Sequence, residues 1–201
     1  MKPFLFGAIV TIVLGITGYL IWSTISTNIK SKTGGPVHWH ADFEIWNCGE
    51  KIDIIDPKGW DNKVGTPLFH EHSDGRIHVE GPVMDYSEIS LGQFFRVIGG
   101  ELASSSLSTP VNNGLVIMEN GTKCGGETGE VQVLVYKTEG KTFFQEKLVD
   151  PASYILSPHS KVPPGDCIII EFDKKKDKTD KICNFYEVAI QKGEILEQSR
   201  E

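Results

Sequence analysis

The first thirty residues contain an apolar segment that restricts where the chain can reside. Between Lys2 and Lys30 lie 27 consecutive uncharged residues, and residues 4–25 are almost all Ile, Val, Leu, Phe, Gly and Thr. At 1.5 Å per residue, a helix of about 20 such residues crosses the hydrocarbon core of a bilayer. A cleaved signal peptide is the alternative, but its apolar region is usually shorter, about 7 to 15 residues, and ends in small residues. Because residues 23–26 (Ser-Thr-Ile-Ser) are a poor cleavage site, we predict that residues 1–30 form an uncleaved membrane anchor.

The anchor also bears on partners and orientation. Gly7, Thr11 and Gly15 place a small residue at every fourth position, a spacing that permits two such helices to pack closely. The same spacing also arises by chance. A homodimer through the anchor and a spacing without function are therefore the two alternatives. Positive charges flank both ends of the segment, Lys2 on one side and Lys30 on the other, and do not determine which end lies in the cytoplasm.

The rest of the chain is acidic. Hydrophobic residues make up 39% of the sequence and charged residues 23%, which is the composition of a folded chain rather than a disordered one. Residues 31–201 hold 18 Lys and Arg against 27 Asp and Glu, a formal charge of −9. We therefore expect no nucleic-acid partner, because phosphate neutralisation requires clustered Lys and Arg. The negative charge of residues 31–201 would instead favour the binding of a cation.

Four cysteines occur without a Cys-x-x-Cys pair: Cys48, Cys124, Cys167 and Cys183. An even set of this kind fits two structural disulfides in an oxidising compartment better than a redox motif or a zinc knuckle. Three pairings are open, and the sequence does not decide among them. Four reduced, buried thiols in a cytosolic domain are the alternative. Together with the anchor, the disulfides predict a single-pass protein of the plasma membrane whose globular domain lies outside the cytoplasm.

After a linker at residues 31–36, the pattern changes to the alternation typical of β-strands. Residues 37–45 alternate strictly, with His38, His40, Asp42 and Glu44 on one face and apolar residues on the other. Further strands are predicted at 51–55, 68–72, 76–80, 115–119, 131–136, 142–148, 167–172 and 182–190, with a short helix at 91–98, a polar loop at 104–113 and a helical turn after Asp150-Pro151. The predicted fold class is α+β, a mostly antiparallel sheet with about two short helices after one N-terminal transmembrane helix. Residues 37–201 are expected to form one extracytoplasmic domain, or two subdomains at about 37–100 and 114–195.

Five of the six histidines lie within 41 positions: His38, His40, His70, His72 and His78. A His-x-His pair on a strand projects both imidazoles to one side, roughly 7 Å apart along the chain, so that two nitrogens can approach one ion. Two such pairs on adjacent strands would enclose it. The alternative is that each histidine is a solvent-facing strand residue or is held by a hydrogen bond. The clustering of two pairs with His78 favours a metal site.

The turn after the second His-x-His pair decides whether His78 joins the site. A two-residue turn would place His78 on the face opposite to His70 and His72. A three-residue loop at Ser73-Asp74-Gly75, with a left-handed glycine, would instead pair His70 with His78 and put all three histidines on one face. We predict the three-residue loop, because it also turns the apolar residues of the following strand toward the core.

The chemical types of the candidate ligands restrict which metal ion the site can bind. Imidazoles with an occasional carboxylate suit Zn, Cu, Ni or Fe, whereas calcium needs oxygen ligands at a regular spacing that the sequence lacks. Copper(II) or zinc is therefore the expected cofactor. Asp42, Glu44 and Glu80 are predicted to support the ligands from a second layer, as acceptors that orient the rings. In an enzyme a general acid or base must lie beside the metal, and Asp42, Glu44, Glu71 and Glu80 are the candidates.

Two resemblances follow from these motifs. His38-Trp39-His40-Ala41-Asp42-Phe43-Glu44 resembles the first metal motif of the cupins, His-x-His-x(3)-Glu, over seven residues. It implies a cupin-like metalloenzyme, which is the alternative function.

The second resemblance is wider. It includes His38-Trp39-His40-Ala41, the stretch HEHSDGRIHVE from His70 to Glu80, and Leu91-Gly92-Gln93-Phe94-Phe95, and so spans about residues 37–98. This pattern resembles a group of uncharacterised, membrane-anchored extracytoplasmic proteins of archaea and small-genome bacteria with paired His-x-His motifs. Some of them carry names suggesting disulfide isomerases, but this chain has no Cys-x-x-Cys pair for such an activity. The resemblance implies that this chain shares a module with these proteins and lies, as they do, outside the cytoplasm.

The sequence thus predicts a membrane-anchored domain outside the cytoplasm that binds copper or zinc through paired His-x-His motifs, in a binding or sensing role. A cupin-like metalloenzyme and an interaction domain with incidental histidines are the alternatives. No protein partner or substrate is indicated.

Overall fold

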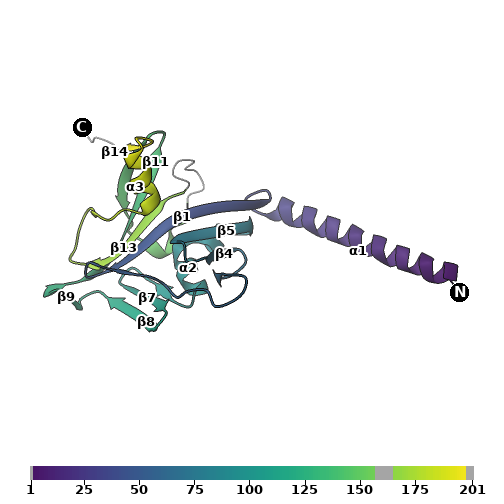
Figure 1. Cartoon of the computed structure of the whole chain (residues 1–201), viewed down its shortest axis with the longest axis horizontal. Coiled ribbons are helices and arrows are strands. Elements are labelled where there is room, and N and C mark those ends of the chain that lie inside the picture. Colours follow the sequence, from purple (N-terminus) through teal and green to yellow (C-terminus); the bar gives the residue numbers. More distant parts are fainter. Residues whose placement is uncertain (1, 157–164, 198–201) are drawn as a thin grey trace.

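A long helix opens the chain. The computed structural model describes residues 2–156 and 165–197, and helix α1 (Lys2–Lys30) extends away from the β-rich body (Figure 1). Pro3–Lys30 is long and apolar enough to cross a membrane, and its most apolar stretch is not buried against the rest of the described chain. At 1.5 Å per residue, the 29 residues of α1 extend about 43 Å, more than the roughly 30 Å of a hydrocarbon core. The apolar helix predicted for the anchor is therefore present.

A nine-stranded mixed sheet forms the centre of the body. Its order is β14-β12-β11-β13-β1-β5-β4-β3, with β2 paired to β1. The strands are β1 (Pro36–Asn47), β2 (Glu50–Ile52), β3 (Val64–Gly65), β4 (Phe69–Glu71), β5 (Arg76–Pro82), β11 (Glu130–Glu139), β12 (Thr142–Lys147), β13 (Cys167–Asp173) and β14 (Leu196–Glu197). β1 lies between β13, which runs parallel to it, and β5, which runs antiparallel. It thus joins strands from the first and second halves of the chain.

Smaller elements flank this sheet. A three-stranded sheet contains β6 (Glu101–Leu102), β7 (Ser106–Val111) and β8 (Gly114–Glu119), and a two-stranded ribbon contains β9 (Lys123–Cys124) and β10 (Glu127–Thr128). The short helices are α2 (Leu91–Val97) and α3 (Asn184–Gln191), with 3-10 turns η1 (Tyr86–Ile89) and η2 (Pro151–Ser153). The predicted α+β class with a mostly antiparallel sheet is confirmed, and so are the predicted short helix near residue 91 and the helical turn after Asp150.

Apolar residues cover the two faces of the sheet differently. On one face, β1, β4 and β5 pack against Phe94 and neighbouring residues of α2 in the larger hydrophobic cluster. On the other face a smaller cluster joins Ile169 of β13 to Tyr186 of α3. Because side chains alternate along a strand, His38 and His40 lie on the face of α3, opposite to the α2 cluster. The histidines therefore lie on the less covered side of the sheet.

Two disulfides close the body, as the cysteine count predicted. Cys48, in the turn after β1, is bonded to Cys124 of β9, with Cα atoms 5.4 Å apart. Cys167, at the start of β13, is bonded to Cys183 at the N-cap of α3, with Cα atoms 5.7 Å apart. None of the four cysteines is free. This pairing is one of the three that the sequence left open.

Most of residues 182–190, predicted as a strand, lies in helix α3 instead. Its N-cap is Cys183, and the buried residues of the segment are Cys183, Tyr186 and Ala189. These lie three positions apart, which is the spacing of one helical face rather than of a strand. The disulfide from Cys183 to Cys167 fixes the start of this helix against the start of β13.

Residues 104–113, predicted as a polar loop, contain strand β7. It is paired with β8 along its whole length, and Leu107 and Thr109 are fully buried. Ser106 and Ser108 lie on the other face. The segment therefore alternates as a strand although its composition resembles that of a loop.

Candidate metal site

The hairpin of β4 and β5 turns through the three-residue loop that the sequence predicted. Ser73 and Gly75 both have a left-handed backbone, with φ of 63° and 70°. His70 is paired directly with His78. His70, His72 and His78 therefore share one face of the hairpin, which confirms the predicted loop geometry.

β5 lies between the two His-x-His pairs. The register places His40 of β1 opposite His78, and His38 opposite Glu80. The two pairs are thus separated by a whole strand, which corrects the expectation that they lie on adjacent strands. The ring of His78 stands between them, with its centroid 4.6 Å from that of His40 and 4.7 Å from that of His72.

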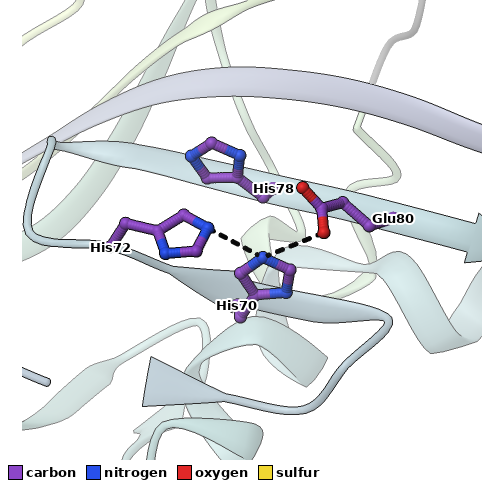
Figure 2. Close-up of side chains that lie close together, drawn as sticks. All are labelled: His70, His72, His78 and Glu80. Carbon is purple, nitrogen blue, oxygen red and sulfur yellow. Dashed lines mark hydrogen bonds and ion pairs between the residues drawn. The ribbon is translucent and has the colours of Figure 1, made fainter. Parts of the chain in front are cut away.

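Four side chains converge beside β4 and β5, and we call them the inner group: His70, His72, His78 and Glu80 (Figure 2). One ligand atom from each lies within 4.8 Å of those of the other three. His70 and His78 are buried, with 0% and 7% exposure. Around a tetrahedral ion with bonds near 2.0 Å, ligand atoms lie roughly 3.3 Å apart, so a modest contraction of this group would enclose one ion.

A second set shares one residue with the first, and we call it the outer group: His38, His40 and His78. Its ligand atoms also lie within 4.8 Å of one another. His38 is the most open member, because 63% of its side chain is exposed. The five histidines predicted as ligands are therefore brought together as two overlapping groups rather than around one point.

Each ring of the inner group has its second nitrogen bound to an acceptor. Nδ1 of His70 lies 3.0 Å from the carbonyl oxygen of Thr66, and Nδ1 of His72 lies 2.6 Å from that of Asn62. Nε2 of His78 lies 3.1 Å from Oδ2 of Asp74. Acceptors of this kind fix the orientation and tautomer of metal-binding histidines.

The inner nitrogens of His70 and His72 face each other as lone pairs. Carbonyl oxygens only accept hydrogen bonds, so in each neutral ring the hydrogen must be on Nδ1 and the lone pair on Nε2. The two Nε2 atoms lie 3.1 Å apart (dashed in Figure 2). Two lone pairs at this distance repel each other unless a proton or a metal ion lies between them.

Protons are disfavoured at His40, His70 and His78. Burial, with a further contribution from the ammonium of Lys63, lowers the pKa of His70 to about 4. Burial and the neighbouring ring of His78 lower the pKa of His40 to about 4, and burial also lowers the pKa of His78 although Asp74 opposes the shift. All three imidazoles are therefore neutral near pH 7, as metal ligands must be.

Glu80, predicted to support the ligands or to act as a general acid or base, lies among the ligands themselves. Its Oε1 is 3.2 Å from Nε2 of His38, and its Oε2 is 3.7 Å from Nε2 of His70 and 3.0 Å from Nζ of Lys63. The hydrogen bond from Lys63 lowers the pKa of Glu80, so the carboxylate is charged at neutral pH. Oε1 of Glu80 thus faces His38 of the outer group, and Oε2 faces His70 of the inner group.

The other predicted carboxylates lie outside both groups. Asp42 accepts a hydrogen bond from Nε of Arg76 at 2.7 Å. Glu44 accepts from Nζ of Lys51 at 2.6 Å and from Nε1 of Trp46 at 3.0 Å. Among the described residues, Glu44 is therefore not brought together with the two histidines of the cupin-like motif.

Sequence reasoning missed the groups that orient the rings. Asn62 and Thr66 act through backbone carbonyls, which have no sequence signature. Asp74 could have been found from the predicted loop, since it lies in the turn that delivers His78. Glu71, considered as a catalytic acid or base, instead accepts from the backbone N–H groups of Asp74 and Gly75 at 2.7 and 3.2 Å, and so stabilises the loop.

No protein-family model, curated protein or solved structure matches this chain. The resemblance to membrane-anchored extracytoplasmic proteins therefore stays a prediction. The geometry establishes two overlapping groups that could hold a metal ion, in a body that follows one helix long and apolar enough to cross a membrane.

Proposed function

We propose that the protein is a membrane-anchored domain outside the cytoplasm that binds a copper or zinc ion through the inner group, in a binding or sensing role. The contact between Nε2 of His70 and Nε2 of His72 carries this proposal, because two lone pairs 3.1 Å apart need a cation between them. A copper or zinc ion would convert this repulsion into two ligand bonds. The resemblance noted for residues 37–98 agrees with the proposed location.

The donor set supports the choice of ion and of role. Three imidazole nitrogens and one carboxylate oxygen suit zinc or copper(II), whereas calcium and magnesium prefer oxygen ligands. Zinc bound by four protein ligands has no open position for a substrate, which is typical of structural rather than catalytic sites. The inner group alone therefore favours binding over turnover.

The covalent structure supports the proposed location. Both disulfides are of the kind that persists in oxidising compartments. Between the end of α1 at Lys30 and the start of β1 at Pro36 lie only five residues, so the body would stay close to the membrane surface. The metal site would then sample the medium next to the membrane on the extracytoplasmic side.

Metal retention by the full chain tests the function. The protein, purified in detergent micelles without a polyhistidine tag, is loaded with Zn²⁺, dialysed against metal-free buffer and analysed for metal. We expect tightly retained zinc in the parent and loss of the inner ion in a His70→Ala/His72→Ala variant. Glu44→Gln is the matched control and should retain zinc as the parent does, since Glu44 belongs to neither group. A parent chain that retains no zinc, or a double variant that retains as much as the parent, contradicts the proposal.

A further inference from the structure

The carboxylate of Glu80 faces two imidazoles that come from different strands. Oε1 lies 3.2 Å from Nε2 of His38 on β1, and Oε2 lies 3.7 Å from Nε2 of His70 on β4. The first distance is close to the separation of two ligand atoms on one ion, roughly 3.3 Å. A carboxylate that presents one oxygen to each of two histidine groups has the geometry of a bridge between two ions.

The two groups offer more donors than one ion uses. Five imidazole nitrogens and two carboxylate oxygens are present, and they do not converge on one centre within the described residues. His78 belongs to both groups but has one lone pair to give: Asp74 holds the hydrogen on Nε2, and Nδ1 is buried without a hydrogen-bond partner. It can therefore complete the shell of only one ion, and the donors that remain are enough for a second.

We propose that the site is dinuclear: a second copper or zinc ion is held by His38, His40 and Oε1 of Glu80, next to the ion of the inner group. This inference rests on the proposed function, because the inner ion is taken as the neighbour. The rings of His38 and His40 lie with centroids 4.6 Å apart, and Glu80 is directly paired with His38 across β1 and β5. The second ion thus uses side chains that the register already brings together.

The two ions differ in their access to solvent. His70 and His78 of the inner group are buried, whereas 63% of the His38 side chain is exposed. With His78 on the inner ion, the outer ion has three protein donors and one open position for water or an exchangeable ligand. The outer ion is therefore the one that solutes can reach and that exchanges faster.

Lys63 contacts the Glu80 oxygen that faces the inner ion and not the oxygen that faces the outer ion. Its Nζ lies 3.0 Å from Oε2 of Glu80, where it compensates the carboxylate charge. Oε1, which faces His38, is free of this contact. Two metal ions, one at each oxygen of Glu80, would compensate the carboxylate charge in place of the ammonium of Lys63.

Stoichiometry in the full chain tests the bridge. Zinc-loaded and dialysed protein in detergent micelles, without a polyhistidine tag, is expected to hold two ions per chain. The His38→Ala/His40→Ala variant should hold one, and Glu44→Gln, on the same strand and face, should still hold two. One ion in both the parent and the His38/His40 variant overturns the dinuclear inference and leaves the proposed function intact. Two ions in that variant place the second ion elsewhere and also overturn the inference, whereas no ion in the parent overturns the proposed function itself.

A spectroscopic measurement tests the bridge independently of the number of ions bound. Metal ions that share a bridging carboxylate lie about 3.5 to 4 Å apart. In the parent chain loaded with Cu²⁺, electron paramagnetic resonance should show a coupled pair with a half-field transition. The His38→Ala/His40→Ala variant should give the spectrum of an isolated Cu²⁺. An uncoupled spectrum in the fully loaded parent contradicts the bridge.

Discussion

His70 and His72 point Nε2 atoms at each other across 3.1 Å, and each ring is held in place from behind by a backbone carbonyl. Neither ring can turn to present an N–H without losing its contact to Thr66 or Asn62. The hairpin therefore arranges both lone pairs before an ion arrives. Ligands fixed in advance lose little conformational freedom on binding, which favours affinity.

Removing the acceptor behind His78 should weaken metal binding without unfolding the domain. Asp74→Ala deletes the carboxylate 3.1 Å from Nε2 of His78, and the loss of such an orienting group typically costs about 10- to 100-fold in metal affinity. Asp74→Asn keeps an acceptor oxygen and should lose much less. Zinc competition with a chelator measures both. Equal affinities for the Ala variant and the parent would show that this contact does not orient the ligand.

Lys63 should act against the metal. Its ammonium lies 3.0 Å from the Glu80 oxygen that faces His70 and repels any cation bound there. Lys63→Gln should raise zinc affinity by about 3- to 10-fold at low salt, and less at high salt because the charge is partly screened. Lys137→Gln, which removes a lysine paired with Glu146 instead, is the control and should have no effect. Weaker binding in Lys63→Gln would mean that Lys63 supports the site.

The metal-free protein should lose stability as the pH falls below about 6.5, where the imidazoles of an unfolded chain begin to bind protons. Burial lowers the pKa of His40 and His70 to about 4, whereas imidazoles of an unfolded chain titrate near 6.5. Between these values the unfolded state binds more protons, so the free energy of unfolding falls as the pH drops from about 6.5 to about 4. Urea unfolding of the metal-free chain across this range measures the slope. A His40→Ala/His70→Ala variant should show a shallower slope, and an equal slope would contradict the low pKa values.

The disulfides predict the result of a thiol count. Denatured, unreduced protein should contain no titratable thiol, and reduction should release four. Reduction should also lower the free energy of unfolding by about 2–4 kcal/mol for each bond, in the usual range for native disulfides. Four thiols before reduction would contradict a domain that resides in an oxidising compartment.

Local sequence patterns were sufficient to predict the β4–β5 hairpin that carries the inner group. The alternation after Gly75 and the glycine itself determine the loop, because a shift of one residue would turn Ile77 and Val79 away from the core. Cysteine usage likewise predicted the two disulfides, but their pairing depends on which turns meet in space. Helix α3 was missed because Ile182, Val188 and Ile190 favour a strand, and the helical spacing of its buried residues appears only once they are known to be buried.

The arrangement of the ligands depended on tertiary structure. Both His-x-His pairs were identified from the sequence, yet the position of β5 between β1 and β4 is a property of the sheet order that no local pattern contains. That order separates the histidines into two groups and brings Glu80 between them. The carbonyls of Asn62 and Thr66 orient the rings through the backbone, where any residue type would serve.

Anomalous diffraction from zinc-loaded crystals tests the central claim most directly. The account predicts a zinc peak between His70 and His72, about 2.0–2.1 Å from each Nε2, with both Nδ1 atoms still bound to their carbonyls. It would be contradicted by crystals grown with excess zinc near pH 7 in which the two rings keep their orientation and no anomalous peak lies between them.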